Sequence, residues 1–363
     1  MPKKICFLEG DISRSGGTER ITTEIANQLS DFNNKYEIHI LSLVKQGDTN
    51  FFDIRESITT SVLFNQPNIN MKRDYLYIVH CIRKYIKKHK IDVLIDVDTV
   101  LDVFSIPATR FTKTKFISWE HFNYYENLGV KYRDWGRRLS ARYADALVTI
   151  TDEDKGYFLK NLKPNCPVYS IYNPIPFRKN KHQYNIDSKI ILSAGRLTYQ
   201  KGFDMLIDVA KDVFENNPEW KWIILGEGED RHILEEKIAE FNLKNHVILE
   251  GNVKNINNYY EQASIFVLTS RYEGFGLVLT EAKSHGLPCV SFKCKAGPSE
   301  IILDNINGYL IDCFNIKDMA DKINCLIEDV KLREEFSDYA LVDTEKFSKK
   351  NIILQWMNIM DNL

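Results

Sequence analysis

Short apolar runs alternate with helix-length segments through both halves of the chain, and this alternation is what most constrains the fold. Residues 4–8, 36–44 and 91–98 are rich in Ile, Val and Leu, and residues 189–193 and 264–269 repeat the pattern in the second half. Continuous apolar runs of this length are typical of strands buried on both faces of a parallel sheet. Parallel strands need crossover connections, which are usually helices. The sequence therefore predicts an α/β protein with two Rossmann-like, doubly wound parallel-sheet domains.

The length and the composition fit two globular domains. The chain has 363 residues, of which 44% are hydrophobic and 27% are charged, as in soluble proteins with real cores. Two prolines, Pro174 and Pro176, followed by a polar run, indicate a linker. We predict a first domain over residues 1–173, a linker over 174–188, a second domain over 189–345, and a C-terminal helix over 346–363 that packs back on the first domain.

Charge and cysteine content limit the partners and the compartment. A net charge of −2 gives no general attraction for polyanions, so nucleic acid is not an expected partner. The seven cysteines form no CxxC pair and no Cys/His cluster, which is typical of free thiols in a reducing cytoplasm. The N-terminal apolar run is too short for a signal peptide, and no segment approaches the about 18 apolar residues of a membrane-spanning helix. We expect a cytoplasmic protein that does not span a membrane.

The most informative motif lies between the strand predicted over residues 264–269 and a helix that starts near Leu277. Glu273-Gly274-Phe275-Gly276 forms the turn at the carboxyl end of that strand, where open α/β sheets bind ligands. Glycines let backbone N–H groups approach a ligand closely, and a helix N-terminus favours a phosphate. Glu281 lies about one turn along that helix from its start, so the two carboxylates would address different parts of one elongated, hydroxyl-rich ligand. The alternative is an ordinary turn with a helix-start acid.

Two more loops follow predicted strands and carry glycine. Gly195-Arg196 and Lys201-Gly202 present two cations five residues apart on one loop, a spacing that can clamp a diphosphate; the alternative is a pair of solvated cations. Gly16-Gly17 precede a helix in the first half, where an anion or a sugar could approach, or where the loop is simply flexible. The chain has no GxGxxG motif, which argues against a nicotinamide dinucleotide fold.

Glu273-x7-Glu281 and Gly195-Arg196-Leu-x3-Lys201-Gly202 together resemble the retaining nucleotide-sugar glycosyltransferases of glycosyltransferase family 4, also called glycosyl transferases group 1. The resemblance covers essentially the whole chain and implies the GT-B architecture, in which two Rossmann-like domains face a central cleft. It also implies which residues bind the donor: Gly195, Arg196, Lys201, Asn252, Val253, Glu273, Gly274, Phe275, Gly276, Leu277 and Glu281. Within that set, Arg196 and Lys201 would hold the pyrophosphate, and Asn252 and Val253 would lie near the nucleobase. Glu273 would accept hydrogen bonds from the donor sugar, and Glu281 would accept hydrogen bonds from the ribose.

The resemblance also suggests roles for polar residues at the ends of first-half strands. Gly16, Gly17, Asp98 and His121 would line the acceptor side, and Glu273, His121, Arg196 and Lys201 would be the catalytic set. On spacing alone, a lone His is more often structural. Asp96 and Asp98 form an Asp-x-Asp pair, which holds a divalent metal in other sugar-transferase folds. This pair lacks the flanking residues of such a motif, so we predict no metal and no cofactor beyond the nucleotide-sugar co-substrate.

The activity implied is retaining, metal-independent transfer of a hexose or N-acetylhexosamine from a nucleotide-sugar, with a UDP-sugar favoured. The acceptor would be a glycan, such as a polyprenyl-diphosphate-linked oligosaccharide in surface polysaccharide, lipopolysaccharide or glycoprotein glycan synthesis. Three alternatives stay open: a transferase that uses a GDP-sugar, a GT-B nucleotide-sugar epimerase, and a catalytically silent protein that binds nucleotide-sugars. Retention of both glutamates and both cations weighs against the silent protein.

Cationic side chains gather in the first half. A helix predicted over residues 71–90 ends in five basic residues, Arg83, Lys84, Lys87, Lys88 and Lys90, and a second basic helix follows over 133–143 with Arg133, Arg137 and Arg138. These cations would form either a solvated face or a docking surface for anionic lipid headgroups. We expect the second, which would make the protein peripheral at the inner face of the cell membrane.

Overall fold

The computed structural model describes residues 1–65, 69–175 and 184–363, and these divide into two compact units. The first unit contains Met1–Pro174 together with Lys349–Leu363, and the second contains Ile175–Ser348. The chain therefore passes from the first unit to the second and back again. Most of the linker predicted over residues 174–188 falls on residues 176–183, which lie outside the described residues.

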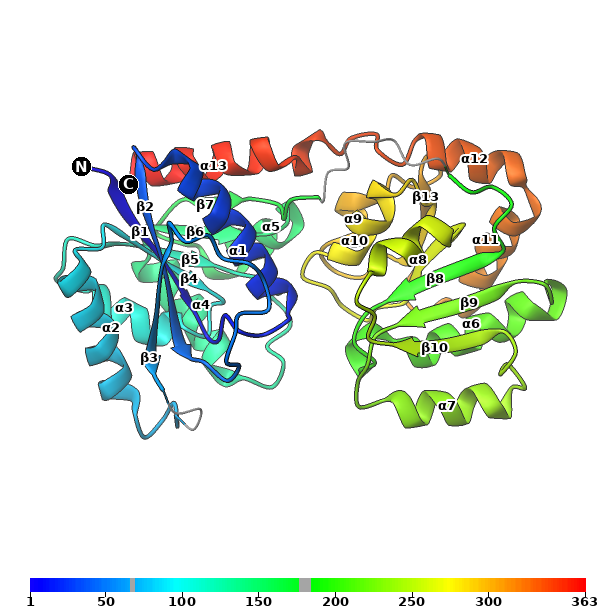
Figure 1. The fold of residues 1–363 in the computed structure, drawn as a ribbon, viewed down its shortest axis with the longest axis horizontal. Helices are drawn as coiled ribbons and strands as arrows, with labels where there is room; N and C mark the ends of the chain where they lie inside the picture. Colours follow the sequence, from blue (N-terminus) through cyan, green and yellow to red (C-terminus); the bar gives the residue numbers. More distant parts are fainter. Residues whose placement is uncertain (66–68, 176–183) are drawn as a thin grey trace. The chain divides into compact units, whose positions relative to one another are not determined.

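The first unit is built on a seven-stranded parallel sheet with the order β3-β2-β1-β4-β5-β6-β7 (Figure 1). The strands are β1 (Lys3–Glu9), β2 (Tyr36–Val44), β3 (Thr59–Phe64), β4 (Val93–Val97), β5 (Lys115–Trp119), β6 (Ala146–Thr149) and β7 (Val168–Ser170). Ile5 of β1 lies opposite Ile38 of β2 on one side and Val93 of β4 on the other. All five residues of β4 are buried, as expected for a central strand covered on both faces.

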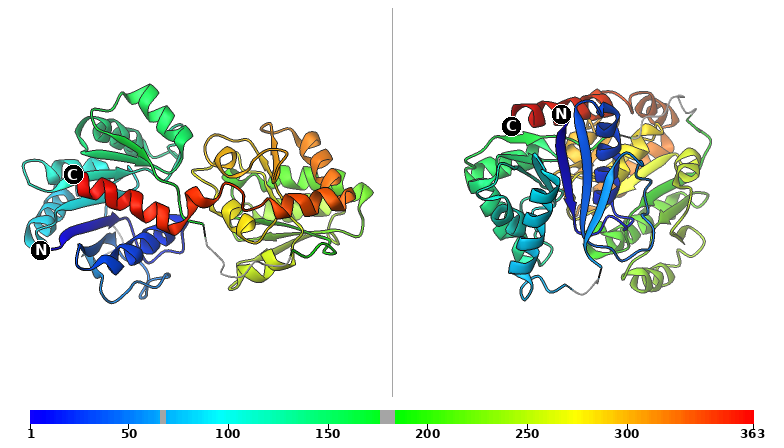
Figure 2. Two further views of the ribbon diagram at one scale, coloured as in Figure 1. Left: turned by 90° about the horizontal axis from the view of Figure 1, so that it is seen from above. Right: turned by 60° about the vertical axis from the view of Figure 1, so that its left-hand side comes forward.

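Helices cover both faces of this sheet. They are α1 (Gly17–Leu29), α2 (Tyr75–His89), α3 (Asp102–Thr109), α4 (Lys131–Tyr143), α5 (Asp152–Leu162) and α13 (Lys349–Asn362), with a short 3-10 turn η1 (Ser30–Phe32). Ile78, Ile82 and Ile86 recur every four residues along α2 and bury one stripe of that helix against a core that α2 shares with α3. The right-hand view of Figure 2 shows α2 on one side of the strands and α1 on the other.

The last helix, α13, completes the first unit. The Trp356 ring lies 4.7 Å from the Trp119 ring of β5, and both side chains are buried. At the end of the helix, Asp361 accepts a hydrogen bond of 2.8 Å from the Tyr36 hydroxyl and pairs with Lys35. These contacts explain why the apolar face of a C-terminal segment is buried rather than exposed.

The second unit has a six-stranded parallel sheet with the order β10-β9-β8-β11-β12-β13. Its strands are β8 (Ile190–Ala194), β9 (Lys221–Leu225), β10 (Val247–Gly251), β11 (Ile265–Leu268), β12 (Cys289–Phe292) and β13 (Gly308–Ile311). Its helices are α6 (Phe203–Asn216), α7 (Arg231–Glu240), α8 (Ile256–Gln262), α9 (Leu277–Ser284), α10 (Pro298–Ile301), α11 (Ile316–Glu328) and α12 (Val330–Asp338), with the 3-10 turns η2 (Tyr199–Lys201) and η3 (Glu345–Phe347). Figure 1 shows α6 and α7 on one side of the sheet and α8 and α9 on the other.

The predicted fold class is confirmed: both units are doubly wound parallel sheets. Strand β2 has the predicted bounds. Helix α3 was not predicted, because residues 102–109 contain Pro107 and because seven of the eight residues are buried, polar ones included, so that no polar face marks an amphipathic period. Within the part of the chain that the structure describes, no helix is both long enough and apolar enough to cross a membrane.

Candidate active site

The candidate donor loops meet at the point where the strand order of the second unit reverses. Strands β8 and β11 are neighbours in the sheet, although β9 and β10 lie between them in sequence. The loop over residues 195–202 leaves the carboxyl end of β8, and the loop over residues 269–276 leaves the carboxyl end of β11. Ligands of open α/β sheets bind at such a topological switch point.

Backbone contacts hold these two loops against each other. Gly202 has φ +65°, and a Cβ atom there would come within 2.2 Å of the Thr269 carbonyl oxygen, so the approach requires glycine. The Arg271 N–H donates to the Gln200 carbonyl oxygen at 2.8 Å, and the Gln200 side-chain amide donates to the Tyr272 carbonyl oxygen at 3.2 Å. The two loops therefore form one preformed surface.

Arg271 strengthens this junction. Its guanidinium makes two hydrogen bonds to the Asp204 carboxylate, of 2.8 and 2.6 Å, and lies 4.0 Å from the centre of the Tyr199 ring. The ion pair lowers the pKa of Asp204, against the opposing effect of burial. Sequence reasoning assigned no role to any of these three residues. Arg271 stands only two residues before Glu273 of the motif, but its partners become visible only once the strand order is known.

Lys201 and Glu273 form an ion pair within this surface. The Lys201 Nζ donates to the Glu273 Oε1 at 2.6 Å, and the side chains are 15% and 6% exposed. The same carboxylate oxygen accepts a 2.6 Å hydrogen bond from the Ser270 hydroxyl. The residues predicted to clamp a diphosphate and to bind a sugar are thus in direct contact, and Ser270 is a member of the site that the sequence reasoning missed.

The remaining groups that could bind an anion belong to the same two loops as Lys201 and Glu273, or to the start of the helix that follows. Arg196 is exposed, so its guanidinium is accessible to a ligand. Gly276 has φ +93° and caps the N-terminus of α9, and Leu277 is its first residue. Unsatisfied N–H groups at a helix N-terminus carry partial positive charge. The site therefore combines the Arg196 guanidinium with backbone N–H donors.

Glu281 lies further along α9 and is buried. Its Oε2 accepts a 2.9 Å hydrogen bond from the hydroxyl of Tyr260 on α8. The Tyr260 ring also stacks on the His285 ring, with centroids 4.9 Å apart. Tyr260 therefore fixes the orientation of Glu281, a role that sequence reasoning did not assign.

Lys283 is an unexpected buried cation on the same helix. Its side chain is completely buried, and its Nζ donates to the carbonyl oxygen of Ile301 at the end of α10 at 2.6 Å. Burial lowers the pKa of Lys283 to about 8. The amine thus connects α9, the helix that carries Glu281, to the end of α10.

The other predicted donor residues occupy the rim of the sheet. Asn252 is exposed and Val253 half-buried, directly after the edge strand β10. Gly274 is half-buried in the turn. The Phe275 side chain is buried, with its ring 5.6 Å from that of Phe347, so only its backbone could face a ligand.

The first unit has its own switch point, between β1 and β4. Gly16 and Gly17 are exposed at the start of α1, in the loop that follows β1. Asp98 follows β4 in a left-handed backbone conformation with φ +90°. Its carboxylate accepts a 2.7 Å hydrogen bond from Arg133 and another, of 3.0 Å, from the Val100 N–H.

His121 follows β5 and is 7% exposed. Its ring lies 4.2 Å from the Trp119 ring, and its Nε2 has no hydrogen-bond partner within the described structure. Burial lowers the pKa of His121 to about 3, so the imidazole is neutral at physiological pH. A neutral, unpartnered ring nitrogen can exchange a hydrogen bond with a hydroxyl group.

The prediction that Arg133 and Arg137 belong to a cationic surface was wrong. Arg133 is 4% exposed and pairs with Asp98, while Arg137 is 2% exposed and donates to Glu120 at 2.6 Å. Both arginines project inward because carboxylates from other elements, half-buried Asp98 and buried Glu120, neutralise them. Of the three arginines predicted there, Arg138 alone is exposed.

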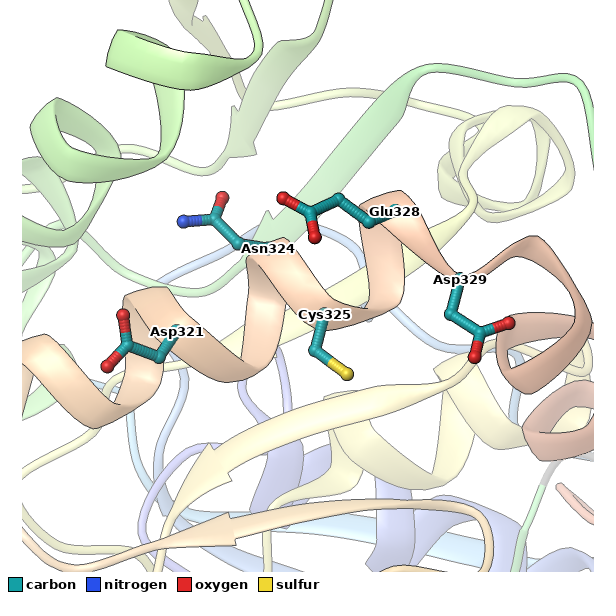
Figure 3. Close-up of a pocket in the computed structure, with 5 residues that line it drawn as sticks. All are labelled: Asp321, Asn324, Cys325, Glu328 and Asp329. Atoms are coloured by element: carbon teal, nitrogen blue, oxygen red, sulfur yellow. The ribbon is translucent and has the colours of Figure 1, made fainter.

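Two further observations concern the rest of the described structure. Among the described residues there is no group of three or more His, Cys, Asp and Glu side chains that could hold a metal. A hollow of about 620 Å³ lies along α11, lined by Asp321, Asn324, Cys325, Glu328 and Asp329 (Figure 3). Acidic side chains predominate there, and the hollow does not include a residue of the β8 or β11 loops.

Comparison with known structures identifies the fold. HepE of Anabaena, solved in complex with UDP, has the same fold, with a TM-score of 0.81 over 99% of this chain and 100% of that chain at 20% identity. Two parallel-sheet units with this topology define the GT-B architecture of glycosyltransferases.

Comparison of sequences gives the family. Residues 15–179 match the family model "Glycosyltransferase Family 4", and residues 175–342 match "Glycosyl transferases group 1". An uncharacterized glycosyltransferase of Haemophilus influenzae is 31% identical over 99% of this chain and 100% of its own length. A Campylobacter jejuni relative, 26% identical over 98% of both chains, is the GalNAc-α-(1→4)-GalNAc-α-(1→3)-diNAcBac-PP-undecaprenol α-1,4-N-acetyl-D-galactosaminyltransferase. The chain belongs to glycosyltransferase family 4 and is a glycosyltransferase.

Proposed function

We propose that the enzyme transfers a hexose or an N-acetylhexosamine from a UDP-sugar to a glycan acceptor, with retention of configuration and without a metal. The proposal depends mainly on one observation: exposed Arg196 lies on the same loop as Lys201, whose amine pairs with Glu273 at the switch point of the second unit. The UDP bound to HepE, which shares the fold, supports a uridine nucleotide.

The reaction requires stabilisation of a leaving diphosphate. As the bond between the sugar and the β-phosphate breaks, negative charge builds on the diphosphate oxygens, and the acceptor hydroxyl loses its proton as its oxygen bonds to the sugar. The products are a glycoside, UDP and a proton. The Arg196 guanidinium and the N–H groups at the start of α9 can donate to that charge, and losing one such contact costs about 3 kcal/mol of transition-state stabilisation. These donors would supply the positive charge that a metal supplies in other transferases.

The remaining side chains would bind and orient the donor rather than stabilise the charge that builds on its diphosphate. The charge of Lys201 is balanced by Glu273, so Lys201 would act as a positioned N–H donor. Glu273 would accept from hydroxyls of the donor sugar, and Glu281, held by Tyr260, from the ribose hydroxyls. Neutral His121 would exchange a hydrogen bond with the donor sugar, which would make it part of the catalytic set.

The acceptor would be a glycan carried on a polyprenyl diphosphate, extended at the cytoplasmic face of the membrane. The Campylobacter relative, whose acceptor is linked to undecaprenyl diphosphate, supports this choice. Gly16, Gly17 and Asp98 would contribute to the acceptor side. Because Asp98 already pairs with Arg133, it would position the loop rather than act as a base.

The test begins with thermal shifts for UDP-, GDP- and ADP-sugars, followed by transfer assays with and without EDTA. NMR of the product gives its anomeric configuration. We expect stabilisation by UDP-sugars, EDTA-resistant turnover and a retained anomer. Arg196→Ala should lower turnover by about 100-fold, whereas Arg55→Ala, an exposed arginine of the first unit, should not. Equal turnover in the two variants, or an inverted product, would contradict the proposal.

A further inference from the structure

An apolar trough crosses the outer surface of the first unit between α2 and α4. Its volume is about 460 Å³. Leu76 of α2 and Trp135 of α4 form its walls, Val103 of α3 contributes to its floor, and Lys72 and Arg73 line it just before α2. The trough therefore combines an apolar groove with cationic side chains.

Two of the apolar side chains that line this trough, Leu76 and Trp135, are unusually exposed. Leu76 is 79% exposed and Tyr77, beside it, is 61% exposed. Trp135 is 61% exposed, whereas the other four tryptophans of the chain are between 0% and 3% exposed. A large aromatic side chain left in water next to a leucine costs hydrophobic free energy unless something covers it.

A second aromatic group continues the same surface. Phe111, just after α3, is 95% exposed, and Tyr143 at the end of α4 is 40% exposed. The Arg110 guanidinium lies 5.0 Å from the centre of the Tyr143 ring and 5.7 Å from that of Phe111. Arg83 of α2 donates to the Arg110 carbonyl oxygen, which ties this group to the same helix that carries Leu76.

The charge around both aromatic groups is positive. Exposed cations follow the apolar residues along both helices, namely Lys84, Lys87 and Lys88 on α2 and Arg138 and Arg142 on α4. The acids nearby are engaged: Asp74 pairs with Arg73, and Asp134 accepts from Asn127. This concentration is local, since the whole chain has a net charge of −2.

We propose that this face, defined by Leu76, Tyr77, Phe111, Trp135 and Tyr143 with the surrounding cations, docks on an anionic phospholipid bilayer. Trp and Tyr side chains settle at the boundary between headgroups and acyl chains, and cations beside them attract anionic headgroups. The inference rests on the proposed function only in that a lipid-linked acceptor would lie in such a membrane.

A second copy of this chain is a poorer occupant of the face. A two-fold dimer would place the same cations of both copies against each other, and like charges across an interface oppose association. An anionic bilayer complements both the apolar and the cationic side chains.

Intrinsic fluorescence tests the docking directly, because Trp135 is the one exposed tryptophan of the five. The full-length protein is mixed with vesicles of phosphatidylglycerol or of phosphatidylcholine, with and without bromine on the acyl chains. We expect sedimentation with phosphatidylglycerol that weakens with salt, and quenching of Trp135 emission by the brominated lipid. If the protein sediments with the vesicles but Trp135 is not quenched, another surface binds the lipid. If it does not sediment, no surface binds the lipid. Either result overturns the proposal. A concentration-dependent change in Trp135 emission without vesicles, accompanied by dimerisation, would also overturn it.

A charge placed on the face provides the matched comparison. Leu76→Glu should weaken vesicle binding at least tenfold, and Ile233→Glu on α7, where Ile233 is 58% exposed, should not weaken it. Equal binding by the two variants would overturn the proposal. Transfer to a water-soluble acceptor glycan should be the same in both variants, because neither residue belongs to the donor loops. If vesicle binding behaves as expected but no UDP-sugar is transferred, the proposed function fails and the docking surface stands.

Discussion

The Lys201–Glu273 pair gives the most direct test of the candidate site. Lys201→Met removes the cation and leaves a carboxylate that is 6% exposed next to Ser270. Removing one member of a buried ion pair typically costs 3–5 kcal/mol, and because Lys201 is 15% exposed we expect about 3 kcal/mol. In a unit of this size each kcal/mol changes Tm by about 2–4 °C, so Tm should fall by about 6–12 °C.

Glu273→Gln should cost less, about 1–2 kcal/mol, because the Lys201 amine can turn toward solvent. The double variant, Lys201→Met with Glu273→Gln, removes both charges and should be more stable than the sum of the single changes predicts. We expect a coupling energy of about 2 kcal/mol, as found for directly interacting residues.

The assay is thermal unfolding of the four proteins, with and without UDP. Lys189→Met is a suitable control, since its ion pair with Glu219 is about half exposed at 3.6 Å and should contribute no more than about 1 kcal/mol. If the effects of the two single changes simply add, the pair does not form in the free protein, and the reasoning for a preformed site is refuted. The same result would return Lys201 to the role of an independent diphosphate ligand.

Three further predictions concern other parts of the molecule. Tyr260→Phe removes the hydroxyl that orients Glu281 and should weaken UDP binding about tenfold by calorimetry; an unchanged Kd would exclude this role. Because burial lowers the pKa of Lys283 to about 8 while the unfolded chain keeps an ordinary value near 10.5, the unfolded state binds more protons between these values. Stability should therefore rise by roughly 3 kcal/mol from pH 8 to 10.5, and Lys283→Met should lose this rise in thermal unfolding measured across that range. Trp356→Ala opens a cavity against Trp119 and should destabilise the first unit by about 3–5 kcal/mol, and a loss below 1 kcal/mol would show that α13 is not part of its core.

Local sequence patterns predict most of the strands and helices because each one carries its own signal. The apolar run of β2 and the four-residue spacing of isoleucines in α2 are visible without any partner. Helix α3 lacks such a signal, since Pro107 interrupts its sequence and seven of its eight residues are buried. A helix that is buried almost all round loses the polar face that makes it recognisable.

The candidate site is predicted only loop by loop. Each loop carries its own glycine and its charged residue, but the contact between Lys201 and Glu273 depends on β8 lying next to β11. The burial of Arg137 has the same origin, since Glu120 comes from a different element and neutralises it. A pattern along the chain cannot show which side chains meet across a sheet, and for that reason Arg133 and Arg137 of α4 were wrongly predicted to be surface cations.

The route of the chain has a consequence for biosynthesis. Ile175–Ser348 is a continuous stretch, whereas the first unit needs Lys349–Leu363 to cover Trp119. Translation releases the end of the chain last, so the unit that begins at Met1 cannot be finished until the entire other unit has been synthesised. We expect the second unit to reach its native state first on the ribosome, which reverses the usual order in which N-terminal domains fold ahead of the rest. Until α13 arrives, the nascent first unit would present an uncovered aromatic surface around Trp119 to chaperones.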